Sequence, residues 1–246
     1  MGNAVVHFEI GGPDDQSLVA FYQELFGWEM KPMDGGGYTL IDTRGGGGIN
    51  GGIGRSRTGE PWSTFYVSAQ DPQAILDKAT ALGGTVVMPV TDFGGAVTIA
   101  MFNDPDGLLV GVVKAESGVE DSGPGPSAGE GAPVDWFEVL GSAAERTQRF
   151  YCDLFSWTAD TSSFPGYGLA DTGAGHGIQG GLGAAQETRW ATICASVPDV
   201  GLALRRAEQL GGSRVYGPNA AGEGMQTGAL RDPAGNIFGV YHRDTA

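Results

Sequence analysis

The chain has 246 residues, a hydrophobic fraction of 41% and a formal net charge of −15. This length allows one large domain or two of ordinary size, and the apolar content suffices for a packed core. Nucleic acid is excluded as a partner, because the 14 basic residues form no cluster that could neutralise phosphates. No apolar run is long enough to span a membrane, no secretory signal is visible and the cysteines number two. We therefore expect a reduced, cytoplasmic protein without membrane contact.

A strand and an amphipathic helix are expected near the N-terminus. Residues 5–10 alternate with period two, which indicates a half-buried strand that carries His7 and Glu9 on one face. Asp14 or Asp15 can cap the helix that follows. Apolar side chains then recur at helical spacing up to a glycine that ends the helix: Leu18, Phe21, Tyr22, Leu25 and Phe26, followed by Gly27.

Short strands and glycine turns fill the next stretch, as the 44 glycines of the chain predict. A second helix is expected after Asp71 as its cap, with Pro72 in the first turn and a stop at Gly83-Gly84. The segment Asp104-Pro-Asp-Gly107 is a strong turn signal between two later strands. The expected strands cover residues 38–42, 49–54, 62–70, 86–90, 96–103 and 108–114.

Nearly all of these features occur a second time. Phe150 lies 129 residues after Phe21, and Asp232 lies 128 residues after Asp104. The motifs Phe-Tyr-x-x-Leu-Phe-x-Trp, Gly-Tyr-x-Leu-x-Asp, Ile-x-Gly-Gly-x-Gly and Asp-Pro-x-Gly are all repeated. A duplicated domain is the economical explanation. We predict domains at residues 1–114 and 134–246, joined by a linker at 115–133 that is rich in Gly, Pro and acidic residues.

This set of motifs resembles the vicinal oxygen chelate superfamily, which includes glyoxalase I, bleomycin-resistance proteins and extradiol dioxygenases. In particular, the chain resembles tandem two-domain glyoxalase-like proteins common in actinobacteria, some of which are named hydroxylases. The resemblance implies an α+β fold in which paired βαβββ modules form cup-shaped mixed sheets around a small-molecule cavity. Because one fold can host many chemistries, the function has to be argued from individual residues.

The resemblance also implies where a divalent metal would be held. The four ligand positions fall in the first half on His7, Asn50, Thr64 and Gly111, and in the second half on Trp136, Gln179, Thr192 and Gly239. Divalent metals prefer imidazoles and carboxylates, whereas glycine offers no side-chain ligand and threonine is a poor one. His7 is thus the one matched ligand position. We expect no cofactor, and a divalent metal is disfavoured.

His7 has three interpretations: a metal ligand, a general base or hydrogen-bond donor in a metal-free cavity, or a structural histidine of the strand. Glu9 and Glu138 lie two residues after the first ligand position of each half, and so on the same strand face. On a cavity wall they would be buried carboxylates that act as acid or base, or that bind a cationic or hydroxyl-bearing ligand. Otherwise they form a salt bridge or a backbone cap. His7 with Glu9 is the hypothesis for an acid–base pair.

The other candidates are ligand-binding residues. Asn50 and Gln179 could orient a carbonyl or phenol, or could serve the neighbouring turn. Trp62 and Trp190 could wall an aromatic pocket or pack in the core. The predicted ligand-binding set also includes Trp136, Thr64 and Thr192.

We therefore expect a small-molecule-binding, glyoxalase-like protein that is metal-independent and that binds or transforms a small organic ligand. The resemblance implies that this ligand is an aromatic secondary metabolite. One alternative is a metal-dependent lyase or oxygenase of the same superfamily. Another is a non-catalytic protein that sequesters a drug. Whether the chain is an enzyme stays open, with lyase, hydroxylase or oxygenase chemistry as options. The expected assembly is a monomer with internally paired domains or a homodimer.

Overall fold

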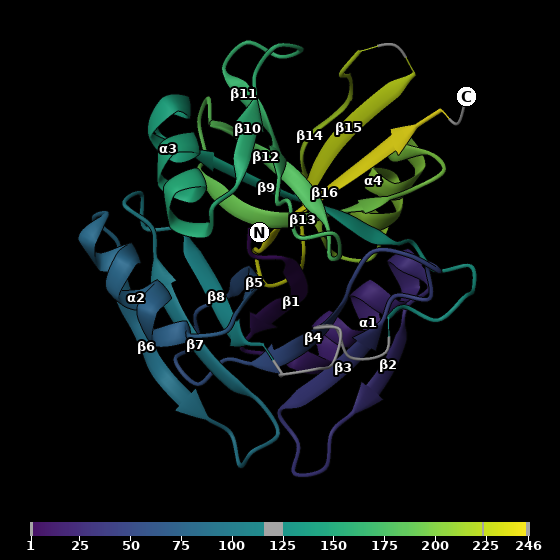
Figure 1. The fold of residues 1–246 in the computed structure, drawn as a ribbon. Coiled ribbons are helices and arrows are strands. Elements are labelled where there is room, and N and C mark those ends of the chain that lie inside the picture. The colour runs from purple at the N-terminus through teal and green to yellow at the C-terminus, as the bar shows by residue number, and fades with distance from the viewer. Residues whose placement is uncertain (1, 116–124, 223, 245–246) are drawn as a thin grey trace. The chain divides into compact units, whose positions relative to one another are not determined.

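The computed structural model describes residues 2–115, 125–222 and 224–244 (Figure 1). In the first half the elements are β1 (Val5–Gly12), α1 (Asp15–Phe26), β2 (Glu29–Pro32), β3 (Tyr38–Asp42), β4 (Asn50–Arg55), β5 (Trp62–Ala69), α2 (Pro72–Ala81), β6 (Thr85–Asp92), β7 (Thr98–Asn103) and β8 (Leu109–Lys114). In the second half they are β9 (Val134–Gly141), α3 (Ala144–Phe155), β10 (Thr158–Asp160), β11 (Tyr167–Asp171), β12 (Gln179–Ala184), β13 (Trp190–Ser196), α4 (Val200–Gln209), β14 (Ser213–Ala220), β15 (Met225–Arg231) and β16 (Ile237–Arg243).

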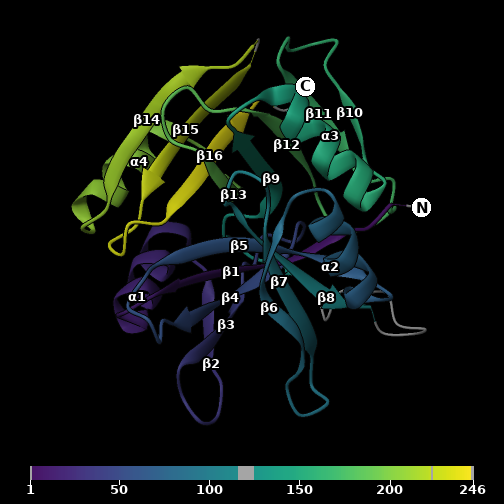
Figure 2. The ribbon, with the colours of Figure 1, turned by 90° about the vertical axis from the view of Figure 1, so that its left-hand side faces the viewer.

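These strands form two eight-stranded mixed sheets with the same topology. The first has the order β2-β3-β4-β1-β5-β8-β7-β6, and the second has the order β10-β11-β12-β9-β13-β16-β15-β14. Each sheet therefore joins two βαβββ modules, and the predicted α+β tandem fold is confirmed. The antiparallel pairs β2–β3 and β6–β7 extend as hairpins in Figure 2.

The predicted helix signals act as expected. The Asp14 carboxylate accepts a hydrogen bond from the Ser17 amide at 3.1 Å, and Gly27 ends α1 in the left-handed conformation with φ of 70°. Asp71 and Asp199 cap α2 and α4 in the same way. Two edge strands, β2 and β10, were not expected from the sequence, because their short and exposed segments carry no apolar alternation.

The described residues divide into two compact units, each of which takes modules from both halves. Unit 1 draws on Met1–His7, Thr64–Gly123 and Trp136–Ala191, and unit 2 draws on Phe8–Ser63, Pro124–Asp135 and Thr192–Ala246. This division groups contacts, so the domain boundaries at residues 114 and 134 stay a prediction. Part of the expected linker, residues 116–124, lies outside the described residues.

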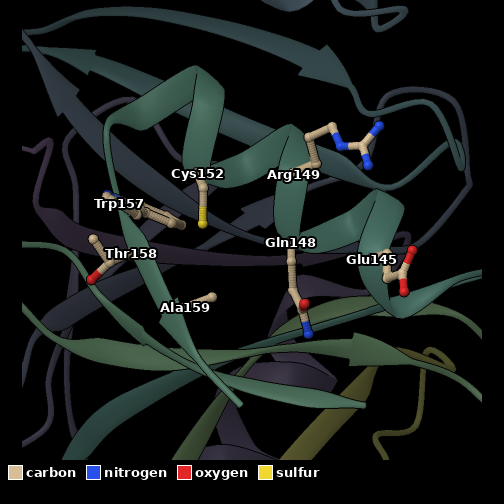
Figure 3. A pocket seen from close by; sticks show the side chains of 7 residues that line it. All are labelled: Glu145, Gln148, Arg149, Cys152, Trp157, Thr158 and Ala159. Atoms are coloured by element: carbon tan, nitrogen blue, oxygen red, sulfur yellow. The ribbon is translucent and has the colours of Figure 1, made fainter. Parts of the chain in front are cut away.

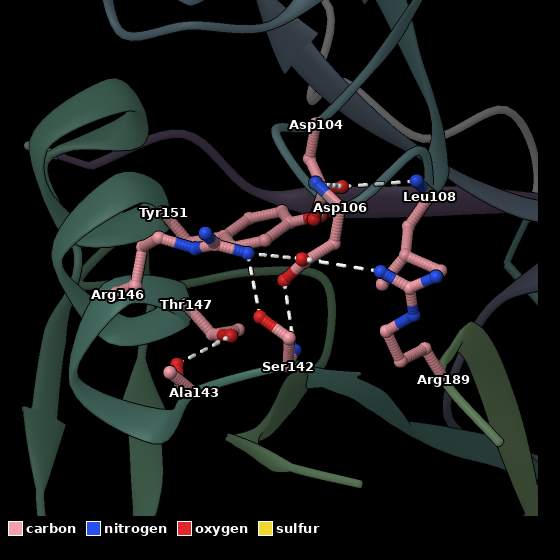
Figure 4. A network of polar contacts seen from close by, with 9 residues as sticks. All are labelled: Asp104, Asp106, Leu108, Ser142, Ala143, Arg146, Thr147, Tyr151 and Arg189. Atoms are coloured by element: carbon pink, nitrogen blue, oxygen red, sulfur yellow. Dashed lines mark hydrogen bonds and ion pairs between the residues drawn. The ribbon is translucent and has the colours of Figure 1, made fainter. Parts of the chain in front are cut away.

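Within each unit, a repeated motif of one half binds a repeated motif of the other. In unit 2 the Tyr22 hydroxyl donates a hydrogen bond to Asp232 at 3.1 Å. In unit 1 the Tyr151 hydroxyl donates to Asp104, also at 3.1 Å (Figure 4). Burial raises the pKa of both carboxyl groups. The Phe-Tyr and Asp-Pro-x-Gly motifs thus recur because they pair with each other in the core.

The helices cover one face of their strands. Figure 1 shows α4 lying along β14 and β15 in unit 2, and α2 lying along β6 and β7 in unit 1. Phe137 and Val139 of β9 are fully buried, and the Phe137 ring packs on Trp157 at the end of α3, with ring centroids 5.0 Å apart. None of the described helices has the length and apolar character that a membrane-spanning helix requires.

Candidate functional site

The strand β9 turns two half-buried residues away from its helix-covered face. Its burial alternates, so that Phe137 and Val139 are in the core while Trp136 and Glu138 lie on the opposite, helix-free face. The predicted placement of Glu138 on the face of the first ligand position is consistent with this alternation. A carboxylate on such a surface requires polar partners.

Two aromatic side chains supply those partners. The Tyr167 hydroxyl of β11 donates to Glu138 Oε1 at 3.0 Å, and the Trp190 indole N–H of β13 donates to Glu138 Oε2 at 2.9 Å. The Trp136 indole N–H in turn reaches the Tyr167 hydroxyl at 3.4 Å. Trp136, Glu138, Tyr167 and Trp190 are called the Glu138 cluster below, and all four belong to unit 1.

Paired glycines of β12 make room for this arrangement. A Cβ on Gly180 would collide with the Phe137 ring on the core face, and a Cβ on Gly181 would collide with the Tyr167 hydroxyl on the helix-free face. Gly181 is in register with Glu138 on the neighbouring strand. The glycine at this position therefore lets Tyr167 reach across β12 to the carboxylate.

Burial dominates the electrostatics of Glu138. Desolvation raises the pKa of its carboxyl group above the ordinary value, and the hydrogen bonds from Trp190 and Tyr167 oppose that rise only in part. Nearby Asp106 shows the contrasting case (Figure 4). Burial alone would raise its pKa too, but hydrogen bonds from Ser142 and the charges of Arg146 and Arg189 lower it overall.

The first half repeats the carboxylate and the tyrosine in unit 2. The Tyr38 hydroxyl binds Glu9, and burial together with the Glu9 charge raises the pKa of that phenol. A Cβ on Gly52 would collide with Tyr38, as one on Gly181 would with Tyr167. Glu9, Tyr38 and Trp62 are called the Glu9 cluster below.

The tryptophans of the two clusters lie differently. The Trp62 ring covers Gly11 so closely that a Cβ there would collide with it. In the second half the position of Gly11 is taken by Leu140, whose side chain lies close to Gly183. There Trp190 donates its N–H to Glu138 instead.

His7 lies beside an aromatic ring. It forms an edge contact with Tyr66 of β5, with ring centroids 5.9 Å apart. Burial lowers the pKa of the imidazole from 6.5 to about 4, so the ring is neutral at pH 7. Its pairing with Glu9 as acid and base stays a hypothesis.

The residues at the metal positions that the resemblance implies do not fit a divalent metal. The Thr64 hydroxyl donates to the Leu109 carbonyl at 2.9 Å, and the Thr192 hydroxyl donates to the Ile237 carbonyl at 2.6 Å. The space beside Gly239 is filled by the Cys194 side chain. Throughout the described ranges, no three His, Cys, Asp or Glu side chains gather in a way that could hold a metal ion.

The predicted amides serve the backbone. Asn50 Oδ1 accepts the Thr43 amide N–H at 2.9 Å, and Gln179 Oε1 accepts the Thr172 amide N–H at 2.8 Å. Asn50 thus closes the turn before β4, and Gln179 closes the equivalent turn before β12. Of the two interpretations left open for these residues, the contacts favour the structural one.

Two hollows lie away from both clusters. One, of about 460 Å³ in unit 1, lies between α3 and β10, and Figure 3 shows Cys152 and Gln148 projecting from the helix toward Ala159. Burial raises the pKa of the Cys152 thiol, which disfavours a nucleophilic thiolate. The other, of about 800 Å³ in unit 2, is lined by residues that include Phe26, Ala132 and Arg206.

The first half of the chain also matches a known protein family. The family model described as Glyoxalase/Bleomycin resistance protein/Dioxygenase superfamily matches residues 4–112. This stretch is therefore similar to that superfamily. The second half repeats the elements and the strand order of the first, so the same fold occurs twice in tandem.

Known proteins resemble the whole chain. The "Anthracycline biosynthesis protein DnrV" of Streptomyces peucetius is 27% identical over 259 residues, covering 95% of this chain and 90% of that protein. The Mn(II)-bound glyoxalase of Novosphingobium aromaticivorans matches with a TM-score of 0.68 at 14% identity, over 98% of this chain and 82% of that one. The 2,3-dioxygenase LapB of Pseudomonas sp. KL28 has a TM-score of 0.65 at 13% identity, over 100% of this chain and 94% of that one. These structures establish the fold alone. The narrower expectation of a hydroxylase stays a prediction.

Sequence reasoning missed one type of candidate residue, the tyrosines Tyr38 and Tyr167. Both stand in the repeated Gly-Tyr-x-Leu-x-Asp segment, so the signal was present. Its meaning depends on the second glycine of Ile-x-Gly-Gly, because only a residue without a side chain lets the phenol pass to the next strand.

Proposed function

We propose that the protein binds a small aromatic organic molecule on the helix-free face of its second sheet, with no metal in the site. The observation that carries this proposal is the Glu138 cluster: a carboxylate that is held by Tyr167 and Trp190 and lined by aromatic rings. A surface of aromatic side chains with few converging polar groups is typical of small-molecule sites.

The choice of ligand class is supported by similarity. The relative from Streptomyces peucetius is named for anthracycline biosynthesis, and its match covers 95% of this chain. Anthracyclines are planar aromatic compounds, which suit flat stacking contacts with indole and phenol rings. A metal-free site is supported by the hydroxyls of Thr64 and Thr192, both of which donate to backbone carbonyls.

The test is a titration of chelator-treated protein with an anthracycline. Quenching of tryptophan fluorescence measures binding, and chromatography of the same mixtures detects any product. We expect saturable binding that added Mn²⁺, Zn²⁺ or Fe²⁺ does not strengthen. Binding or turnover that appears only with added metal would contradict the proposal and favour the metalloenzyme. A new product without metal identifies an enzyme, and unchanged anthracycline identifies a sequestering protein.

A further inference from the structure

We propose that the Glu138 cluster recognises an organic ammonium group, so that the ligand is an aromatic amine. This inference rests on the proposed function, because it names the class of molecule that the same face takes. It starts from the charge of Glu138 and from what surrounds that charge.

Glu138 is a carboxylate whose hydrogen-bond donors are both neutral. Tyr167 and Trp190 each bind one of its oxygens, and no ion pair found among residues 2–115, 125–222 and 224–244 includes Glu138. A buried carboxylate that stays ionised is stabilised most directly by a cation. Asp106 of the same unit is such a case, because Arg146 and Arg189 both pair with it.

The carboxylate keeps capacity for further donors. An ionised carboxylate offers about four lone-pair sites, and the two aromatic donors occupy two of them. A ligand ammonium would supply both a positive charge and N–H donors, and such charge-assisted bonds are about twice as strong as neutral ones. A ligand hydroxyl could bind there as well, but it would leave the charge uncompensated.

The surroundings favour the same ligand. The side chains of Trp136, Tyr167 and Trp190 adjoin the carboxylate through their hydrogen bonds, and all three are half-buried. Their partly exposed rings could contact the aromatic body of the ligand. The net charge of −15 attracts cations and repels anions over longer range. An aromatic acid would meet both a like charge at the site and a repulsive field around it.

The pH dependence follows from the same contacts. On the strands packed against Glu138, β11 presents Tyr167, β12 presents Gly181 and β13 presents Trp190, so the phenol is the one titratable neighbour that these contacts show. An ammonium ligand requires the ionised carboxylate. Its affinity therefore rises with pH as Glu138 loses its proton, whereas the affinity of a neutral ligand changes little.

The experiment compares two probes of equal shape, 1-naphthylmethylamine, which is cationic at pH 7, and 1-naphthalenemethanol, which is neutral. Both are titrated by tryptophan quenching into the full chain, into Glu138→Gln and into the matched control Glu145→Gln, which removes one exposed charge on α3. We expect the amine to bind the full chain roughly tenfold more tightly than the alcohol. Glu138→Gln should abolish this preference, and Glu145→Gln should keep it.

The outcomes separate the two proposals. Equal binding of both probes to all three proteins would overturn the ammonium inference and leave the aromatic site intact. Binding of neither probe, nor of an anthracycline, would overturn the proposed function as well. Unchanged alcohol binding and a cooperative unfolding transition with a midpoint no lower than that of the wild type show that Glu138→Gln has folded. A retained preference for the amine in this variant then contradicts the inference.

Discussion

The Glu138 cluster of unit 1 and the Glu9 cluster of unit 2 are copies of one arrangement that have diverged at the tryptophan. Both keep the carboxylate, the tyrosine that binds it and the glycine that lets the tyrosine pass. The copies differ because Gly11 admits the Trp62 ring over its strand, while Leu140 takes the equivalent position and Trp190 binds Glu138. A duplicated scaffold can therefore keep a carboxylate and its tyrosine and change the placement of the neighbouring tryptophan through one residue.

The largest loss of stability is expected at buried residues that both copies share. Phe8→Ala and Phe137→Ala each remove a fully buried ring that packs over a glycine of the next strand. Each should lower the free energy of unfolding by about 3–5 kcal/mol, as truncations of buried aromatic residues do. Chemical denaturation measures this loss. A cost near zero for either variant would show that its half does not share the common core.

The next effect tests the residue that separates the copies. Gly11→Leu introduces the side chain of the second copy, which would collide with Trp62. We expect a loss of about 1–3 kcal/mol from overpacking. Denaturation together with the position of the tryptophan fluorescence maximum, compared with that of Trp62→Phe, checks it. A neutral substitution with unchanged fluorescence would mean that Gly11 does not fix the tryptophan.

A smaller effect distinguishes the two tryptophans. Trp190→Phe removes the N–H that binds Glu138 as well as part of the ring, whereas Trp62→Phe serves as the control for loss of ring area. We expect Trp190→Phe to cost about 1–2 kcal/mol more than Trp62→Phe, since it leaves one carboxylate oxygen without its donor. Equal unfolding free energies for the two variants would contradict the assigned hydrogen bond.

The smallest expected effect is a pH dependence of the stability of the folded state. Burial raises the pKa of Glu138 above 4.5, so the folded state holds the proton more tightly than the unfolded state does. The wild type therefore loses stability as the pH rises from 4.5 through the raised pKa, and Glu138→Gln does not. At pH values above the raised pKa, the unfolding midpoint of Glu138→Gln should exceed that of the wild type. At pH values below 4.5, the two midpoints should be similar. A difference that is constant with pH would show that Glu138 titrates normally.

The fold could be predicted from the sequence because its signals are local and occur twice. Caps such as Asp14 and the apolar stripe of α1 need no knowledge of distant residues, and each is confirmed in the structure. The short edge strands β2 and β10 were missed, since exposed strands lack the apolar alternation that marks the others.

The site was harder to predict, because its contacts join residues far apart in the chain. Glu138 and Trp190 were each predicted, yet their hydrogen bond joins residues 52 positions apart. Tyr167 was overlooked, since its role depends on the space above Gly181 on another strand. The hypothesis that Asn50 and Gln179 orient a ligand competes with the backbone contacts that both amides make.

The most direct test of a ligand site at the Glu138 cluster uses the five indole N–H signals in a nitrogen-15 correlation spectrum. Trp136 and Trp190 belong to the cluster and Trp62 to the Glu9 cluster, while Trp157 lines the smaller hollow. Trp28 donates to Ala132, which lines the larger hollow.

Addition of 1-naphthylmethylamine to chelator-treated protein should shift the Trp136 and Trp190 signals and leave those of Trp28 and Trp157 in place. Shifts confined to Trp28, Trp157 or Trp62 would place the ligand elsewhere and contradict the account.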